Sequence, residues 1–322
     1  MKLSAKKILV ITPVNHINNV KKNLKKLGKI TYLNDPSKAK VLKVIHSYDA
    51  IFTNPNKSKV FIDKTIMDKA TKLKVICTAS TGTNHIDKLY AKEKGIHILS
   101  LTNERKVINL ISSTAELAFA LTMASIRNLI PANKSVHNGE WNYEPFVGRQ
   151  ANCLTFGVIG YGRLGSMYAN FCKAFNPNNI LVFDPYKTIN DKSITQVNDI
   201  RKLVELSDVI SIHVHVSEET INLINSNLLK YFKANVILIN TSRGEIINEK
   251  DLINFLKKNK EAKVGVDVLN NEIKNRDCSE LLKFSKSNPD RVLITPHIGG
   301  MTMEAQEIAY NHAVMLLSKY LK

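Results

Sequence analysis

The chain has 322 residues, with 44% hydrophobic and 23% charged side chains, close to the averages of soluble globular proteins. This length allows two domains, and we expect no run of about 20 apolar residues long enough to span a membrane. The formal net charge of +18 comes from widely spread lysines. We therefore interpret it as a basic surface that attracts anionic substrates and rank nucleic-acid binding last.

The first half of the chain alternates short apolar runs with amphipathic segments, a pattern typical of parallel β/α units. Strands are predicted at residues 8–12, 50–53 and 75–79, and helices at 18–27, 63–70 and from Asp87 to near Gly95. An almost wholly apolar helix is predicted at 113–126, buried between domains or subunits. Residues 138–153 are expected to be irregular.

A second series of strands and helices starts at Phe156. Its predicted strands are residues 156–160, 180–184, 209–213, 236–240, 263–266 and 292–295, with helices between them such as 163–175 and 249–257. Six strands joined by helical crossovers predict a doubly wound dinucleotide-binding sheet.

The first turn of this series carries the glycine pattern G-x-G-x-x-G between an apolar strand and an amphipathic helix. Gly160 allows the tight turn, Gly162 lets the backbone approach a pyrophosphate, and Gly165 lets the helix pack closely on the sheet. The phosphates would lie at the helix N-terminus. The expected cofactor-binding residues of this turn are Gly160, Tyr161, Gly162, Arg163, Leu164 and Gly165.

Asp184 ends the next strand, about 20 residues after the glycine turn. A carboxylate at this place accepts hydrogen bonds from the adenosine ribose hydroxyls and repels a 2′-phosphate. NAD is therefore favoured over NADP, although Lys187 leaves NADP open.

An arginine, an acid and a histidine follow three successive later strands: Arg243, the segment Asp267–Glu272, and His297. The carboxyl ends of parallel strands share one edge of a sheet, so these side chains can converge on a nicotinamide. No cysteine or histidine cluster with metal-ligand spacing is seen, and no metal is expected.

The chain resembles the D-isomer-specific 2-hydroxyacid dehydrogenase family, which includes phosphoglycerate dehydrogenases. The resemblance covers nearly the whole chain. It is carried by the glycine turn, His213-Val214 and residues 81–87, 240–244, 267–272 and 295–300. It implies an α/β protein of two doubly wound domains, with a Rossmann NAD-binding domain (103–295) inserted into a flavodoxin-like substrate domain (1–102 plus 296–322). It also implies a homodimer built on the NAD-binding domain.

The same resemblance implies roles for individual residues. His297 is the expected acid–base, Glu272 orients its ring, and Arg243 binds the substrate carboxylate and polarises the reacting carbonyl. The backbone around Ser80, Thr81 and Gly82 is expected to complete the carboxylate site. Further residues expected to line the cofactor are His213, Thr241, Ser242, Asp267, Gly299 and Gly300.

The pattern departs from the family at several positions, including Ile273 where proline usually follows the glutamate. The loop after residues 50–53 carries Lys57 and Lys59 in place of phosphate-binding arginines, so phosphoglycerate is not favoured over glyoxylate, hydroxypyruvate or another small acid. An NAD(H)-sensing corepressor on the same fold remains the alternative. Four scattered cysteines and the lack of a recognisable leader predict a cytoplasmic protein without a membrane partner.

Overall fold

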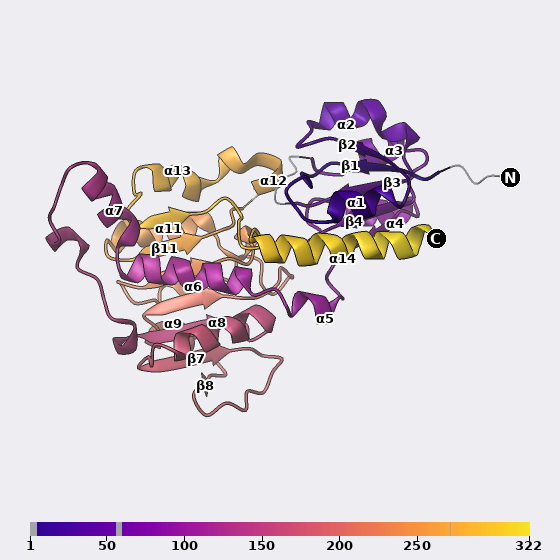
Figure 1. The fold of residues 1–322 in the computed structure, drawn as a ribbon. Coiled ribbons are helices and arrows are strands. Elements are labelled where there is room, and N and C mark those ends of the chain that lie inside the picture. The colour runs from indigo at the N-terminus through magenta and orange to yellow at the C-terminus, as the bar shows by residue number, and fades with distance from the viewer. Residues whose placement is uncertain (1–4, 56–59, 271) are drawn as a thin grey trace. The chain divides into compact units, whose positions relative to one another are not determined.

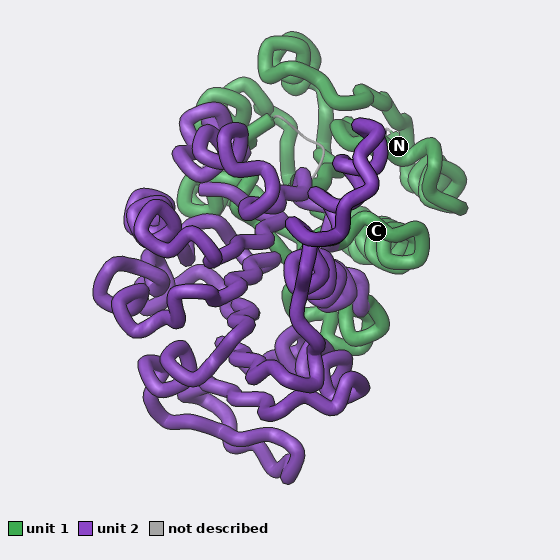
Figure 2. The backbone as a smooth tube through the Cα atoms, turned by 90° about the vertical axis from the view of Figure 1, so that its left-hand side faces the viewer, with its two compact units in different colours: residues 1–111, 300–322 green, residues 112–299 purple. Residues whose placement is uncertain are grey.

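The computed structural model describes residues 5–55, 60–270 and 272–322, which form two compact units (Figure 2). Unit 1 comprises Met1–Ile111 and Gly300–Lys322, and unit 2 comprises Ser112–Gly299. Lys57 and Lys59, raised above as phosphate ligands, lie outside the described residues, as does Asn271.

Unit 1 is built on a parallel sheet of five strands in the order β2-β1-β3-β4-β5. This is the predicted flavodoxin-like order, 2-1-3-4-5. The strands are β1 (Lys7–Val10), β2 (Lys29–Tyr32), β3 (Ala50–Thr53), β4 (Val75–Thr78) and β5 (His97–Leu99).

Helices cover both faces of this sheet, because successive strand side chains point to opposite sides. Ile8 and Val10 pack on one face, with α1 (Val20–Lys25), α5 (Arg105–Ile108) and α14 (Met303–Leu321). Leu9 and Ile11 pack on the other face, with α2 (Lys38–Val44), η1 (Ile45–Ser47), α3 (Lys64–Lys69) and α4 (Lys88–Glu93) (Figure 1).

Unit 2 contains a parallel sheet of seven strands in the order β12-β11-β10-β9-β6-β7-β8. The strands are β6 (Thr155–Ile159), β7 (Asn179–Phe183), β8 (Thr195–Gln196), β9 (Val209–Ile212), β10 (Ile237–Asn240), β11 (Lys263–Val266) and β12 (Val292–Ile294). In chain order, strands β6 to β11 have the order 3-2-1-4-5-6 of the predicted Rossmann fold, and β12 extends the sheet beside β11. The strand order reverses between β6 and β9. The additional strand over the six predicted is β8, whose two residues are too few to show a periodicity.

One face of the unit 2 sheet packs against α6 (Ser113–Ile126) and α8 (Arg163–Lys173). The other face packs against α9 (Ile200–Leu206), α10 (Ser226–Leu229), α11 (Glu249–Lys258) and α13 (Glu280–Lys286). The remaining elements are α7 (Leu129–His137), α12 (Glu272–Asn275) and the 3₁₀ turns Glu144–Phe146, Ala151–Cys153, Gly244–Ile246 and Arg276–Cys278.

The helical segment Arg105–Ile126 is, contrary to expectation, long and apolar enough by composition to cross a membrane. In the structure it consists of two helices, α5 and α6. Helix α6 packs on α8, β10 and β11 inside unit 2, and its buried face includes Ala115, Ala118 and Leu121. This packing accounts for the buried half of α6.

Candidate active site

The turn after β6 brings backbone segments so close together that two of its positions have no room for a side chain. Gly160 has a φ of +89°, and a Cβ there would lie 2.7 Å from the carbonyl oxygen of His213. A Cβ at Gly165 would lie 2.0 Å from the carbonyl oxygen of Gly160. Gly160 is therefore required by its positive φ and by the close approach of the segment after β9, and Gly165 by the packing of α8 on the turn.

Gly162 differs from these two, because a Cβ at this position would meet no described atom within 4 Å. Gly162 is the N-cap residue of the 11-residue helix α8 and offers no side chain to its first N–H groups. A helix N-terminus of this kind presents N–H donors and a positive dipole end to an anion. The open space at Gly162 thus fits the pyrophosphate of a dinucleotide.

Asp184 lies at the end of β7 and holds the glycine turn. Its Oδ2 accepts a hydrogen bond of 2.8 Å from the N–H of Tyr161, and its Oδ1 accepts one of 3.0 Å from the N–H of Tyr186. Each carboxylate oxygen retains a lone pair for a ribose hydroxyl. The Nζ of Lys187 donates to the carbonyl oxygen of Tyr161 at 2.9 Å.

A cavity of about 410 Å³ opens beside Asp184, a size that admits a nucleoside. Its lining consists of Phe183, Asp184, Pro185, Lys187, Thr188, Gln196, Val197 and Asn198. Strand β8, which the sequence did not predict, therefore contributes part of this wall through Gln196.

His213 is packed beneath the glycine turn and is held neutral. Burial lowers the pKa of His213 to about 3. Its Nε2 lies 2.8 Å from the Oγ of Ser211, and its ring centroid lies 5.1 Å from that of Tyr168. A Cβ at Gly165 would come within 3.3 Å of the His213 Cβ. In this structure His213 packs against the glycine turn.

Arg243 is presented by a tight turn after β10 that depends on Asn240, which lies in the motif 240–244 but receives no role from the sequence. The buried Asn240 side chain accepts a hydrogen bond from the N–H of Ser242 (2.9 Å) and donates one to the carbonyl oxygen of Arg243 (2.8 Å). Ser242 Oγ donates to the carbonyl oxygen of Ile212. Thr241, also buried, has no hydrogen-bond partner for its Oγ1 among the described residues.

His297 follows β12 and forms a pair with Glu272. The distance from His297 Nδ1 to Glu272 Oε1 is 2.5 Å, and the two side chains are 22% and 15% exposed. Glu272 Oε2 also accepts from the N–H of Leu269 at 3.2 Å. This contact engages Nδ1 and fixes the orientation of the imidazole ring.

The backbone of His297 has a φ of +55°, in the left-handed region that few non-glycine residues adopt. The buried carboxylate of Asp267 stabilises this loop. It accepts hydrogen bonds from the Thr295 hydroxyl (2.6 Å) and from the N–H groups of Ile298 (2.8 Å) and Gly299 (2.7 Å), on both sides of His297. Burial raises the pKa of Asp267, and these hydrogen bonds and the nearby His297 oppose the rise.

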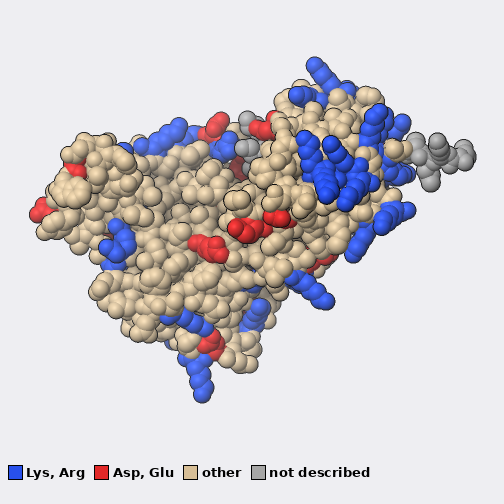
Figure 3. All heavy atoms as spheres, viewed as in Figure 1, with Lys and Arg blue, Asp and Glu red and all other residues tan. Residues whose placement is uncertain are grey.

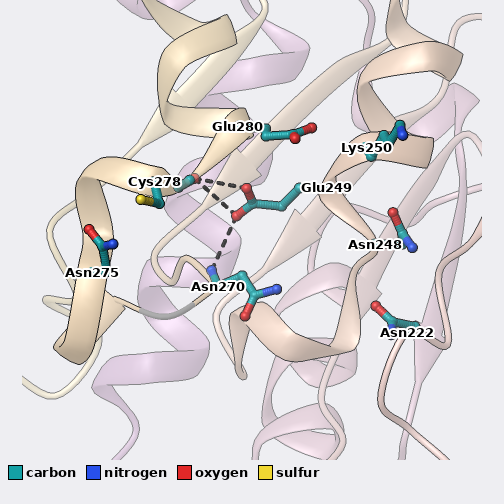
Figure 4. Close-up of a pocket in the computed structure, with 9 residues that line it drawn as sticks. Asn222, Asn248, Glu249, Lys250, Asn270, Asn275, Cys278 and Glu280 are labelled. Atoms are coloured by element: carbon teal, nitrogen blue, oxygen red, sulfur yellow. Dashed lines mark hydrogen bonds between the residues drawn. The ribbon is translucent and has the colours of Figure 1, made fainter.

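Glu249, at the start of α11, fixes the segment that carries Glu272 (Figure 4). Its carboxylate accepts from the N–H of Asn270 (3.2 Å), from Ser279 Oγ (2.9 and 3.0 Å) and from the N–H of Leu281 (3.1 Å). The segment from 270 to 281 is therefore held at both ends by one buried side chain. Beside it lies a cavity of about 230 Å³, which Lys250 and Cys278 also line.

Ser80, Thr81 and Gly82 lie in unit 1, directly after β4. Ser80 Oγ donates to the carbonyl oxygen of Gly82 at 2.7 Å, and Thr102 Oγ1 donates to that of Thr81 at 2.8 Å. Within the described ranges the three N–H groups of this turn donate no hydrogen bond. They are consequently available to an anion.

The predicted site residues of unit 2 thus follow the carboxyl ends of neighbouring strands. The glycine turn, Asp184 and His213 follow β6, β7 and β9, whereas Arg243, the Asp267–Glu272 segment and His297 follow β10, β11 and β12. Gly299 ends unit 2, and Gly300 begins the second segment of unit 1. In the part of the chain that the structure describes, no three His, Cys, Asp or Glu side chains are arranged to bind a metal ion.

Comparison of the chain with known proteins points to one family. A family model described as "D-isomer specific 2-hydroxyacid dehydrogenase, NAD binding domain" matches residues 119–299. The chain is 32% identical to D-3-phosphoglycerate dehydrogenase of Methanocaldococcus jannaschii over 98% of its own length and 57% of that protein. It is 34% identical to glyoxylate reductase of Thermococcus litoralis, with coverage of 84% and 80%.

Solved structures of dehydrogenases also superpose on this chain over most of its length. D-lactate dehydrogenase from Aquifex aeolicus, crystallised with NAD and lactic acid, has a TM-score of 0.79 at 29% identity, with coverage of 98% of this chain and 95% of that one. The chain spans about half of the length of the phosphoglycerate dehydrogenases that it matches. The corepressor alternative gains no support from these relatives. The chain belongs to the D-isomer specific 2-hydroxyacid dehydrogenase family, and it carries that family's NAD-binding domain.

Proposed function

We propose that the protein is an NAD-dependent oxidoreductase that interconverts a small D-2-hydroxy acid and the corresponding 2-keto acid. The observation that carries this proposal is the 2.5 Å pair of His297 and Glu272, which shares a sheet edge with Arg243 and the glycine turn. Family membership supports the same reaction class.

In the oxidation of a hydroxy acid, His297 Nε2 accepts the hydroxyl proton while the hydride leaves the adjacent carbon. In the reverse reaction the protonated ring returns that proton to the carbonyl oxygen. When held at the glycine turn and Asp184, NAD would supply the hydride acceptor for the oxidation, and NADH would supply the hydride donor for the reverse reaction. Glu272 keeps the ring oriented through Nδ1, and its negative charge stabilises the imidazolium formed in the oxidation.

Arg243 carries the charge that a carboxylate substrate requires. Its planar guanidinium can bind the carboxylate in a bidentate manner and polarise the neighbouring carbonyl. The Asn240 hydrogen bonds fix the backbone from which it projects. We assign the unbonded N–H groups of Ser80, Thr81 and Gly82 as further carboxylate donors, and unit 1 as the substrate domain.

Asp184 and its cavity form the adenosine site in this proposal, with NAD preferred because a 2′-phosphate would meet the carboxylate. Among substrates, 3-phosphohydroxypyruvate is not favoured over glyoxylate, hydroxypyruvate or another small acid. The reason is that the loop after β3 has no arginine in its sequence to bind a phosphate bidentately.

We further propose a cytoplasmic homodimer built on unit 2. Large apolar side chains are exposed on α7 and the segment after it: Leu129, Ile130, Val136, Trp141, Tyr143 and Val147. Trp141 is 91% exposed. A second copy of this chain would remove such a surface from water. Helix α6, expected near the interface, is already half buried by its own unit.

The test is the rate of NADH oxidation by the full chain with glyoxylate, hydroxypyruvate, pyruvate, 2-oxoglutarate and 3-phosphohydroxypyruvate, with NADPH run in parallel. Rapid oxidation of NADH with one of these acids supports the proposed reaction and identifies the substrate. If NADH binds but no acid in the panel is reduced, the proposed reaction is contradicted.

A further inference from the structure

The positive charge of this protein is unevenly divided between its two units. Unit 1 contains 24 Lys and Arg against 9 Asp and Glu, a formal net charge of +15, whereas unit 2 contains 22 against 19, a net charge of +3. If lysine were enriched evenly along the whole chain, unit 2, which is the larger unit, would carry at least as much positive charge as unit 1. The charge of unit 1 therefore requires a local explanation.

Many of these lysines lie at one end of unit 1, where the parallel strands begin and the helices end. We call this region the basic end. Lys7 and Lys29 are register partners at the first positions of β1 and β2, and the N–H of Lys74 donates to the carbonyl oxygen of Asp49. Tyr320, near the end of α14, donates to the carbonyl oxygen of Lys74 at 3.3 Å. The lysines of the basic end are Lys6, Lys7, Lys25, Lys26, Lys29, Lys43, Lys69, Lys72, Lys74, Lys92, Lys94, Lys319 and Lys322.

Few acidic side chains balance this charge. The acidic residues at the same end are Asp49, Asp68 and Glu93, and Asp68 is already bonded to Lys94 at 2.7 Å. Lysines in the last turns of helices stabilise the helix dipole, which accounts for residues such as Lys25. The helix dipole does not account for lysines outside helices, such as Lys29 and Lys74. Figure 3 shows blue side chains gathered over the α1 part of unit 1.

This charge is poorly placed to attract a substrate. Ser80, Thr81 and Gly82 follow the carboxyl end of β4, whereas the basic end lies where the strands begin. A four-residue strand with a rise of about 3.3 Å per residue separates these two ends by about 13 Å. The Debye length at physiological salt is only about 8 Å. At physiological salt the lysines of the basic end are therefore largely screened from an anion bound at these N–H groups.

We propose that the basic end binds the phosphodiester backbone of a nucleic acid without reading its sequence, contrary to the expectation from the sequence alone. Closely spaced lysines neutralise successive phosphates and release their counterions. The basic end contains no arginine, the side chain best suited to bidentate base recognition. Its described large apolar side chains are not exposed, so it lacks the groups with which proteins insert into membranes.

The experiment measures binding of a labelled 20-nucleotide single-stranded RNA, and of the matching single-stranded and duplex DNA, by fluorescence anisotropy between 50 and 200 mM salt. The variant Lys29→Gln/Lys72→Gln/Lys74→Gln removes three exposed charges of the basic end. The control Lys40→Gln/Lys64→Gln/Lys88→Gln removes three exposed lysines near the beginnings of α2, α3 and α4, away from the basic end.

Each lost phosphate contact lowers the slope of log K against log salt by about 0.7 for a single strand. The basic-end variant should therefore lose about 2 units of slope, while the control keeps the slope of the wild type. RNA and DNA arms identify which polymer binds more tightly. Both variants should bind NADH as the wild type does, which separates this test from that of the proposed reaction.

Three results would overturn the proposal: no binding of any nucleic acid at 100 mM salt, equal losses in both variants, or tighter binding to phosphatidylserine vesicles than to nucleic acid. The second result would assign the binding to net charge alone, and the third would assign the surface to a membrane.

Discussion

Replacing the glycines of the turn one at a time should separate packing from cofactor binding. In Gly165→Ala the new Cβ would lie 2.0 Å from the Gly160 carbonyl oxygen, so α8 must move. Overpacking of this kind costs about 1–3 kcal/mol. For a unit of this size each kcal/mol changes Tm by about 2–4 °C, so we expect Tm of the cofactor-free protein to fall by about 2–12 °C.

In Gly162→Ala the Cβ enters open space, and the backbone φ of −70° suits alanine. The unfolded chain loses freedom, which stabilises the protein by about 0.4–1 kcal/mol. The exchange of glycine for alanine at the N-cap of α8 opposes this gain by a similar amount, so the free energy of unfolding without cofactor should change by less than about 1 kcal/mol. If the pyrophosphate lies at this position, the methyl group crowds it. A penalty of about 1–3 kcal/mol weakens NADH binding by about 5- to 150-fold.

Thermal unfolding without cofactor and titration of NADH fluorescence measure the two effects on the same samples. The reasoning is refuted if Gly162→Ala binds NADH as tightly as the wild type, or if it loses as much stability as Gly165→Ala.

Three further predictions concern neighbouring residues. Asp184→Ala should raise the efficiency with NADPH relative to NADH by at least about tenfold, because the carboxylate no longer repels the 2′-phosphate; an unchanged ratio of kcat/KM values would remove Asp184 from this role. His213 has its pKa lowered to about 3 by burial, whereas an unfolded histidine titrates near 6.5. The unfolded state therefore binds the extra proton first, and stability that is present above pH 6.5 is lost as the pH falls toward 3. Denaturant unfolding of His213→Gln should show a smaller decrease of the free energy of unfolding with falling pH in this window. An equal pH dependence of the two proteins would contradict the assignment. Glu249→Gln should lower kcat about fivefold or more and alter the pH profile of kcat, with the KM for NADH little changed, because the segment that carries Glu272 loses its anchor. Lys250→Gln, beside the same cavity, is the matched control, and equal kinetics of the two variants would argue against a positioning role of Glu249.

The fold was largely predictable because its central strands are buried on both faces and rich in Ile and Val. Residues 50–53 and 263–266 were predicted with the bounds that the structure shows, as was the helix at 113–126. The strands not predicted, β2, β5 and β8, lie at sheet edges or span two or three residues, and half-exposed side chains such as those of Lys29–Tyr32 do not form an apolar run. Helix α2 was also missed, since only Val41 of its seven residues is buried.

The candidate site was predictable where chemistry follows from residue type and order, as for Arg243, Glu272 and His297. The residues that hold this site were not. Asn240 and Thr295 lie in the motifs 240–244 and 295–300, but their roles appear only in the fold, where Asn240 bonds the backbone of the Arg243 turn and Thr295 bonds the carboxylate of Asp267. Glu249 acts through backbone groups far away in the sequence, such as the N–H of Asn270, and no local pattern distinguishes it from a surface polar residue.

The central claim is that His297 exchanges the substrate proton. The most direct measurement compares single-turnover NADH oxidation by the wild type and by His297→Gln, with the keto acid that the wild type reduces fastest. General acid–base catalysis contributes about 10²–10⁴-fold, so the variant should be slower by that factor while its Kd for NADH stays within twofold of the wild-type value. A variant that oxidises NADH within threefold of the wild-type rate would contradict the claim.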